Sequence, residues 1–153
     1  MRNNPDCTIK LFNEGNGKEL EKLSTVLTLG VNIDSTISMK TFVNAKCSEA
    51  YYKLRNIGRL RPYIDTPVRI MLVRNLILSK LDYCNAILAN VPDYLVKKLQ
   101  KVLNASVRFI YDVKKYDHIT AFLKKAHFLP VKQRIQYKVS LQNSKWRGTS
   151  IPV

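Results

Sequence analysis

The feature that most constrains the fold is a series of three apolar-patterned segments between residues 38 and 110. In each segment, apolar side chains recur every three or four positions or fill the segment almost continuously. The first pattern is typical of an α-helix that buries one face, and the second of a helix that is covered on all sides. The spacing predicts three consecutive helices, over residues 39–61, 66–88 and 92–110, and therefore a mostly α-helical fold.

The first of these helices combines an apolar stripe with a basic side. We expect it to begin at Ser38, or one turn earlier at Ser35, because a serine hydroxyl caps free N–H groups. Arg55 and Arg59 form a repulsive i,i+4 pair of like charges away from the stripe, which phosphates would offset, although a solvated basic face explains the pair equally well. The stripe that we expect to enter the core consists of Val43, Cys47, Ala50, Leu54 and Ile57.

The second helix is expected to begin at Thr66, with Pro67 at its first position, where the missing N–H is no loss. Between Val68 and Leu81 its apolar residues point in nearly every direction, which predicts a central helix covered by its neighbours. Asp82 interrupts this run. We interpret Asp82 as a buried acid that pairs with an arginine or caps a helix, because no second carboxylate lies at a spacing useful for catalysis.

The third helix separates a dry face from a basic one. The basic face carries Lys97, Lys101 and Arg108, with Asn104 between them and Lys98 nearby. A helix of this kind can lie along a phosphate backbone, and a merely solvated face is the alternative. The dry stripe consists of Leu95, Leu99, Val102, Ser106 and Phe109, widened by Leu103 and Ile110.

The distribution of charge divides the chain and points to a polyanionic partner. The net charge is +15, yet residues 1–37 hold four basic and five acidic groups, which leaves 22 basic and six acidic groups for the remainder. We therefore expect a β segment over residues 1–37 and a basic helical domain over residues 38–141. Residues 142–153 are polar and unpatterned, and we expect a disordered tail in which Trp146 could fold back.

The β segment contains a predicted strand or hairpin over residues 25–34, with Gly30 in its middle. Val31 and Ile33 alternate there with polar residues, which is typical of a half-buried strand. An interior glycine marks a bulge or a close backbone approach, or simply a sheet edge that bends. The residues alone leave these readings open.

Metal-binding, disulfide-stabilised and enzymatic functions have no support in the sequence. Cys7, Cys47 and Cys84 are odd in number and lack a Cys-x-x-Cys spacing, which predicts reduced thiols. His118 and His127 have no cluster of Cys or carboxylate residues around them, so we expect no metal site. The sequence has no Gly-rich phosphate loop, nucleophile–base pair or paired-carboxylate motif.

The sequence also predicts an intracellular protein with no membrane partner. No stretch reaches the ~18 apolar residues of a membrane span. Polar residues follow Arg2 where a signal peptide would have an apolar core. We therefore expect a location in the nucleus or cytoplasm.

Seven short sequence words stand in a consistent order over roughly residues 25–140. They are Leu29-Gly30-Val31-Asn32-Ile33-Asp34, Tyr52-Lys53-Leu54-Arg55-Asn56-Ile57, Arg61-Pro62-Tyr63, Ser79-Lys80-Leu81-Asp82-Tyr83-Cys84-Asn85, Leu99-Gln100-Lys101-Val102-Leu103-Asn104-Ala105, Asp117-His118-Ile119-Thr120 and His127-Phe128-Leu129-Pro130-Val131-Lys132-Gln133-Arg134-Ile135. Together they resemble the downstream part of the reverse transcriptases of non-LTR (LINE, jockey-like) retrotransposons.

This resemblance implies a fold and a partner. Leu29 and Gly30 would belong to the primer grip, and the fold would be a thumb-like helical bundle preceded by a short β-hairpin left over from a palm domain. The thumb holds an RNA/DNA hybrid or duplex by its backbone, and it associates with the other reverse transcriptase domains. The phosphate contacts would be Arg55, Arg59, Lys97, Lys98, Lys101 and Arg108. This assignment is a physical inference, because the seven matching segments do not themselves identify phosphate contacts.

The sequence departs from the family at the catalytic centre. Polymerases of this family bind two Mg²⁺ ions through an adjacent aspartate pair and a further aspartate, and this sequence has no Asp-Asp pair. The chain looks like a C-terminal remnant with Met1 inside the palm. We therefore expect that the chain alone neither polymerises nucleic acid nor binds a cofactor. Without the palm, the strand from Val26 to Ile33 would be an exposed sheet edge that is prone to pair with another strand. The alternative is a relic, or a helical module reused for protein interaction.

Overall fold

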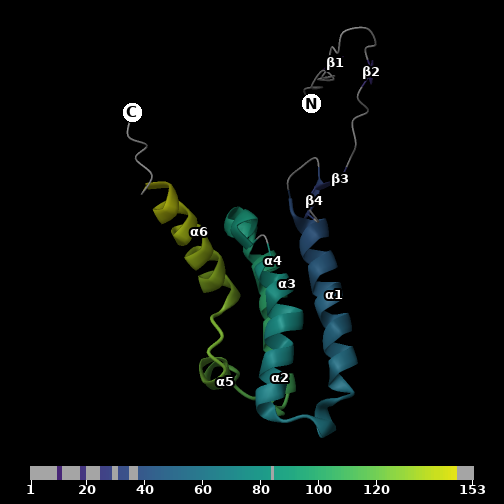
Figure 1. The fold of residues 1–153 in the computed structure, drawn as a ribbon, viewed down its shortest axis with the longest axis vertical. Helices are drawn as coiled ribbons and strands as arrows, with labels where there is room; N and C mark the ends of the chain where they lie inside the picture. The colour runs from purple at the N-terminus through teal and green to yellow at the C-terminus, as the bar shows by residue number, and fades with distance from the viewer. Residues whose placement is uncertain are drawn as a thin grey trace.

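The computed structural model describes residues 10–11, 18–19, 25–28, 31–34, 38–83 and 85–147, and this part of the chain is mostly helical, as the sequence predicts (Figure 1). Two antiparallel strand pairs precede the helices: β1 (Lys10–Leu11) with β2 (Lys18–Glu19), and β3 (Thr25–Thr28) with β4 (Val31–Asp34). The second pair falls in the segment expected to form a strand or hairpin, and residues 29 and 30 between its strands lie outside the described residues.

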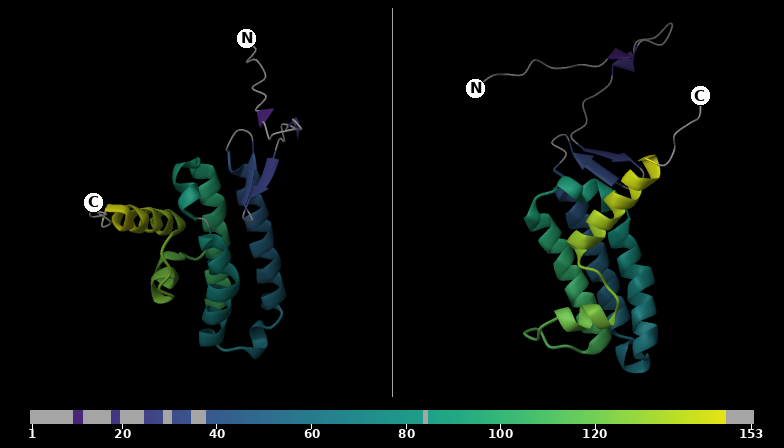
Figure 2. Two further views of the ribbon diagram at one scale, coloured as in Figure 1. Left: turned by 45° about the horizontal axis from the view of Figure 1, so that its top comes forward. Right: turned by 90° about the vertical axis from the view of Figure 1, so that its left-hand side faces the viewer.

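The helical part forms a bundle with a second, peripheral layer. Its elements in chain order are α1 (Lys40–Gly58), η1 (Arg61–Tyr63), α2 (Thr66–Val73), η2 (Arg74–Leu78), α3 (Ser79–Asp82), η3 (Asn85–Asn90), α4 (Asp93–Tyr111), α5 (Thr120–Lys125) and α6 (Val131–Arg147). The elements η1 and η3 are 3₁₀ helices, and η2 is a π-helical turn continuous with α2 and α3. Figures 1 and 2 show α1, α2–α3 and α4 side by side, with α6 on the outside.

Two polar contacts fix the directions of the helices. Lys98 near the start of α4 binds Asn44 near the start of α1, and Asp112 after α4 forms an ion pair with Arg61 after α1. The helices α1 and α4 therefore run parallel. The segment from α2 to α3 returns between their ends and runs antiparallel to both.

The helix α4 supplies the largest share of the core. Its buried residues are Leu95, Leu99, Val102, Leu103, Ser106, Val107, Phe109 and Ile110, which confirms the predicted dry stripe. The buried Ser106 hydroxyl donates to the carbonyl of Val102, so its burial leaves no free donor. The predicted stripe of α1 also enters the core, with Val43, Ala50 and Ile57 buried and Cys47 and Leu54 half-buried.

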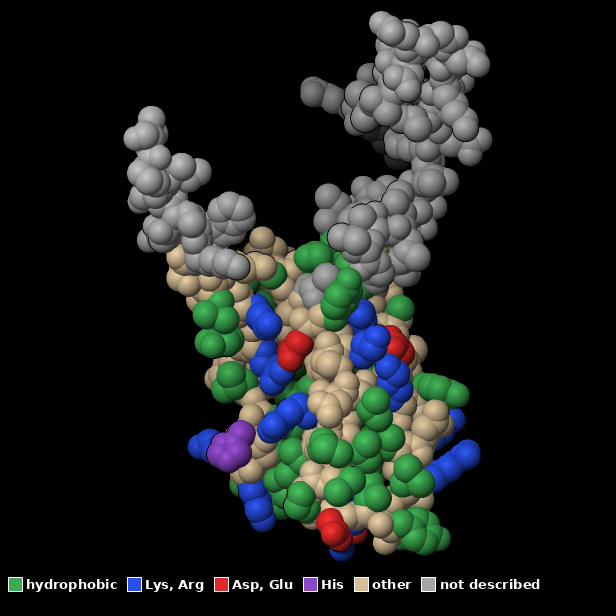
Figure 3. Space-filling model, in the orientation of Figure 1, with side chains coloured by type: hydrophobic (Ala, Val, Ile, Leu, Met, Phe, Trp, Pro, Cys, Tyr) green, Lys and Arg blue, Asp and Glu red, His purple; other side chains and the backbone are tan. Residues whose placement is uncertain are grey.

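The prediction that the second helix is covered on all sides is wrong. Val73, Ile77, Leu78 and Leu81 are buried, but one side stays in solvent, where Met71 is 54% exposed. Figure 3 shows hydrophobic side chains gathered over the lower part of the molecule, where α2 lies. The physical reason is that α6 packs against η3 and α4 and leaves the outer side of α2 open. The central helix is α4.

The helix ends differ from the expected ones by small steps. Met39, and not Ser38, precedes the first turn of α1, in a left-handed conformation with φ 54°. Its side chain is buried, which holds the backbone there, and the Ser38 hydroxyl accepts a long 3.4 Å hydrogen bond from the N–H of Lys40. Asp65 precedes α2, so Thr66 is the first helical residue rather than the cap.

The predicted disordered tail over residues 142–153 is wrong for its first part. Helix α6 continues to Arg147. No glycine or proline stands between Val131 and Gly148, so nothing in the chain stops a helix that has begun. Residues 148–153 and the side chain of Trp146 lie outside the described part. None of the helices that the structure describes is both long and apolar enough to cross a membrane.

Arg69 joins three parts of the bundle through its guanidinium group. Nε donates to the carbonyl of Ile64 at 3.0 Å, Nη1 to that of Ile110 at 3.1 Å and Nη2 to that of Arg61 at 2.9 Å. The first and last of these carbonyls belong to the connection between α1 and α2, and the second to the last turn of α4. Arg69 therefore satisfies backbone acceptors at helix ends that have no partner within their own helices.

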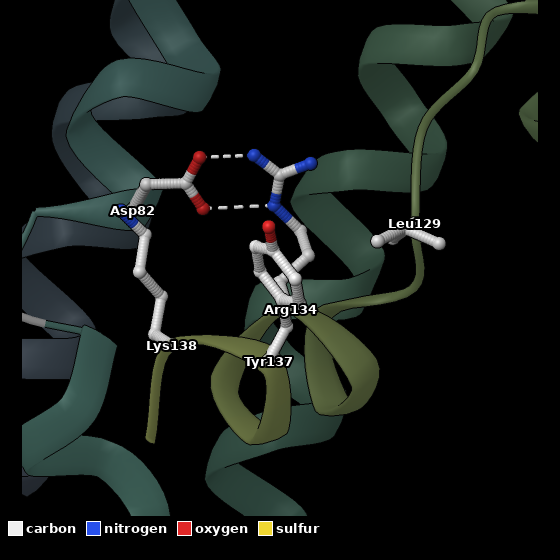
Figure 4. Close-up of a pocket in the computed structure, with 5 residues that line it drawn as sticks. All are labelled: Asp82, Leu129, Arg134, Tyr137 and Lys138. Atoms are coloured by element: carbon white, nitrogen blue, oxygen red, sulfur yellow. Dashed lines mark hydrogen bonds and ion pairs between the residues drawn. The ribbon is translucent and has the colours of Figure 1, made fainter. Parts of the chain in front are cut away.

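Asp82 pairs with Arg134, which confirms its structural interpretation. Figure 4 shows the guanidinium of Arg134 facing the carboxylate, with Nε 2.8 Å from Oδ1 and Nη2 bound to Oδ2. Asn85 donates a further hydrogen bond to Oδ1 at 3.1 Å. The side chains of Asp82 and Arg134 are 25% and 20% exposed. This forked pair attaches α6 to the end of α3.

Replacing Arg69 with methionine should lower the free energy of unfolding by about 2–3 kcal/mol. The variant keeps an unbranched stem of similar length but leaves three carbonyls without their charged donor. Urea denaturation followed by circular dichroism measures the change. Arg74→Met is the matched control, because Arg74 is exposed on the same continuous helix and its loss should change the free energy by no more than about 0.5 kcal/mol. Equal effects of the two variants would contradict the role of Arg69.

A double-mutant cycle of Asp82→Asn and Arg134→Met should give a coupling energy of about 1–2 kcal/mol, because the forked pair is largely shielded from water. Urea denaturation of the four proteins supplies the value. Lys132 and Asp93 form the control pair, since they link α6 to a different helix, α4, but are 3.9 Å apart and 69% and 78% exposed. Their coupling should be close to zero. A coupling for Asp82 and Arg134 no larger than the control would refute the attachment role.

Candidate nucleic-acid interface

A groove of about 340 Å³ lies between α1 and α4. Its walls are Asn44, Cys47, Ser48 and Tyr51 from α1 and Lys98 and Lys101 from α4. The four residues of α1 follow a spacing of three, one and three, which places them on one helical face. The ammonium of Lys98 donates to Oδ1 of Asn44 at 2.9 Å. This bond holds one cation of the groove in place from the opposite helix.

The electrostatic environment of the groove is positive. Lys97 and Lys101 are exposed and form no ion pair with any residue that the structure describes. Burial raises the pKa of the Cys47 thiol, and the nearby charge of Lys98 offsets part of that rise. Burial, together with the neighbouring Cys47, also raises the pKa of Tyr51. The groove therefore presents neutral acceptor and donor groups beside fixed positive charge, which suits an anionic ligand.

The other predicted basic residues continue along the same side of the α1–α4 pair. Arg55 lies eleven residues beyond Asn44, about three turns and 16 Å further on the same helical face, and Arg59 follows one turn later. Arg108 lies seven residues beyond Lys101, two turns further on the same face of α4. Because the two helices are parallel, these positions form one strip, which we call the basic strip: Arg55, Arg59, Lys97, Lys98, Lys101 and Arg108.

Not every member of the basic strip is equally available to a ligand. Arg55, Arg59, Lys97 and Lys101 are exposed. The half-buried Arg108 uses Nε and Nη2 to bind the carbonyls of the loop that follows α4. Lys98 at the groove end is also half-buried and bound to Asn44, so each end of the strip offers two exposed cations.

On the side of α1 that faces α3, the positive charge is largely compensated. Glu49 accepts a hydrogen bond from Lys53 at 2.8 Å, and Lys80 lies 4.0 Å from the same carboxylate. The hydrogen bond from Lys53 is the main cause that lowers the pKa of Glu49. Lys46 lies over the rings of Phe42 and Tyr83, with its ammonium 5.2 and 4.7 Å from their centroids. A phosphate backbone therefore finds more uncompensated charge on the α4 side of α1.

Several expected features lie beyond what the structure describes, and several observed ones were not expected. Leu29 and Gly30, the residues assigned to a primer grip, lie outside the described residues, as do Cys7 and Cys84. Sequence reasoning did not identify Asn44, Ser48 and Tyr51 as groove residues. Their spacing with Arg55 along one face of α1 is a signal that could have found them. The apolar stripe beside this face dominates the pattern and obscures the signal.

Among the residues that the structure describes, the two histidines stand apart from other metal-ligating side chains. His118 and His127 are exposed, and no group of three His, Cys, Asp or Glu side chains within residues 38–83 and 85–147 is arranged to hold an ion.

Comparisons with known proteins add no family to this geometry. No protein-family model, no curated protein and no solved structure matches the chain.

Proposed function

We propose that the chain is the thumb region of a reverse transcriptase of the non-LTR retrotransposon type, and that its basic strip holds the backbone of an RNA/DNA hybrid or duplex. The observation that carries the binding proposal is the groove between α1 and α4, where Asn44 fixes Lys98 beside Lys101 and the exposed Lys97. The family origin rests on the sequence words over residues 25–140. The proposal gives the chain a binding role without polymerase chemistry, because the sequence lacks the adjacent aspartates that bind the catalytic Mg²⁺ ions.

Phosphate contacts account for the expected affinity. A lysine or arginine that neutralises a phosphate releases condensed counterions, and this release makes binding favourable at low salt. Along α1, Arg55 lies about 16 Å from Asn44, the residue that binds Lys98, so a duplex lying along the strip would meet cations at both ends. Such contacts position a duplex without reading its bases. We therefore expect binding that is independent of sequence, as a primer–template thumb requires.

A second candidate function has one observation in its favour. Val68, Met71 and Leu76 are exposed by 39%, 54% and 38% on the outer side of α2 and η2. Exposed apolar residues grouped on one face are typical of protein-interaction surfaces. A reused helical protein-interaction module would therefore use the face formed by α2, and the basic strip would then be an ordinary solvated surface.

Replacing Lys98 and Lys101 together with glutamine should reduce the salt dependence of duplex binding. The slope of log K against log salt concentration should fall by about 1.8, because each lost phosphate contact removes about 0.9. Filter binding of RNA/DNA hybrid over a series of salt concentrations measures the slope. The matched control is Lys132→Gln, an exposed lysine on α6, which should leave the slope unchanged.

Two outcomes of that titration would reject the nucleic-acid proposal. One is no binding at low salt, and the other is a flat response to salt by the unmodified chain. If the chain then unfolds cooperatively with a midpoint that duplex does not shift, the protein-interaction module becomes the better conclusion.

A bound duplex should slow the alkylation of Cys47. In the chain carrying Cys7→Ser and Cys84→Ser, Cys47 is the remaining thiol, and its raised pKa means that the thiolate forms at a higher pH than for an ordinary cysteine. Iodoacetamide labelling followed by mass spectrometry should therefore be slow near neutral pH and faster as the pH rises. Saturating duplex should reduce the rate several-fold by covering the groove. An unchanged rate in a chain that binds duplex would place the ligand away from the groove.

A further inference from the structure

The loop between α4 and α5 holds an aromatic ring in solvent. Tyr116 is 91% exposed, more than any other large hydrophobic residue among those described. The right-hand view of Figure 2 shows this loop projecting from the lower end of the helices. Exposure of a single tyrosine is common on protein surfaces. The loop differs from an ordinary exposed segment because its backbone is braced and its neighbours are basic.

Four hydrogen bonds brace this loop. Arg108 donates from Nε to the carbonyl of Lys114 at 3.3 Å and from Nη2 to that of Lys115 at 3.0 Å. The Asp117 carboxylate accepts a hydrogen bond from the N–H of Lys114 at 3.2 Å, and the N–H of Asp117 donates one to the carbonyl of Lys114 at 3.3 Å. A side chain carried by a braced turn loses less conformational freedom on binding than one on an unbraced loop.

The start of the loop is fixed as well. Asp112 ends α4 in a left-handed conformation with φ 57° and forms an ion pair with Arg61. The loop is thereby tied to the connection between α1 and α2. Both anchoring arginines act on the backbone or on Asp112, which leaves the ring of Tyr116 uncovered.

The side chains around Tyr116 suit an unpaired nucleotide. Lys114 and Lys115 are exposed, and the ammonium of Lys115 lies 5.8 Å from the centroid of the Tyr116 ring. Asp117 is the single acid of the turn, and its carboxylate accepts the Lys114 N–H. An aromatic ring beside cations is the combination that stacks on a base while it neutralises the adjoining phosphates. A base inside a duplex is already stacked on both sides and offers no face to the ring.

We propose that Tyr116, Lys114 and Lys115 form a binding site for an unpaired nucleotide of a single-stranded nucleic acid. The ring of Tyr116 stacks on the base, and the two lysines contact the flanking phosphates. Arg108 positions the loop. The site goes beyond the proposed function and does not depend on duplex binding, although a single strand leaving a duplex on the basic strip would meet this loop at the Arg108 end.

A lipid surface is the competing partner for an exposed tyrosine among lysines, and the structure favours it less. Anchoring in a membrane requires a substantial apolar area to leave water. The neighbouring apolar residues Val113 and Ile119 are half-buried, and Ile119 packs against the core. Tyr116 is thus the one large exposed hydrophobic side chain of the loop, which is sufficient for one base but small for a membrane anchor.

Replacing Tyr116 with alanine should weaken binding of a labelled oligothymidine of about 12 nucleotides by about fivefold or more, the factor expected for one lost stacking contact. Fluorescence anisotropy at fixed low salt measures the Kd. Tyr116→Phe should stay within about twofold of the unmodified chain, because phenylalanine retains the ring face. Tyr137→Ala removes another exposed tyrosine, on α6, and should have no effect. Binding of a duplex of equal length should change by less than about twofold in Tyr116→Ala.

Each alternative result would overturn the site. Unchanged oligothymidine binding by Tyr116→Ala, or an equal loss in Tyr137→Ala, excludes stacking at this position. An equal loss for the duplex excludes selectivity for unpaired bases. If Tyr116→Ala no longer binds phosphatidylserine vesicles that the unmodified chain binds, while its oligothymidine binding is intact, the loop would be assigned to a lipid surface instead. A failure of duplex binding alone rejects the thumb proposal and leaves this one standing.

Discussion

Burial of one face of α4 is the constraint on which the rest of the structure depends. Leu99, Leu103 and Ile110 are fully enclosed, and their apolar surface leaves water only because α1 and α2 pack against them from two sides. Since the core residues recur at helical period, the residues between them must point outward. Lys97, Lys101 and Arg108 occupy those positions. The same periodicity that builds the core therefore also aligns the charge.

The sequence was sufficient where a single helix determined the answer. The stripe of α4 is regular from Leu95 to Ile110, so both its buried and its basic faces followed from spacing alone. The residue type of Asp82, with no second carboxylate at a useful spacing, was enough to predict a structural pairing. The identity of its partner was not predictable, because Arg134 lies 52 residues further along the chain and several other arginines were equally plausible.

The features that escaped prediction arise from contacts between helices. Arg69 looks like an ordinary charge within an apolar run, and only the folded chain brings three carbonyls around it. Asn44 holds a groove lysine only because the fold brings Lys98 of α4 within hydrogen-bond distance of it. The exposed side of α2 likewise depends on where α6 packs, which no periodicity within α2 records. The continuation of α6 to Arg147 is different, because the sequence has no helix-breaking residue there and a polar composition does not by itself end a helix.

The π-helical turn η2 makes chain length a structural determinant. A turn of this type accommodates one residue more than an α-helical path would, so everything that follows it is rotated by about 100° relative to an uninterrupted helix. Arg69 precedes the turn and Asp82 follows it, and each is committed to a fixed partner elsewhere in the bundle. The number of residues between them is therefore as constrained as their identities. Deleting one residue from Arg74–Leu78 would leave a more regular helix, but Arg69 and Asp82 could then no longer both reach their partners.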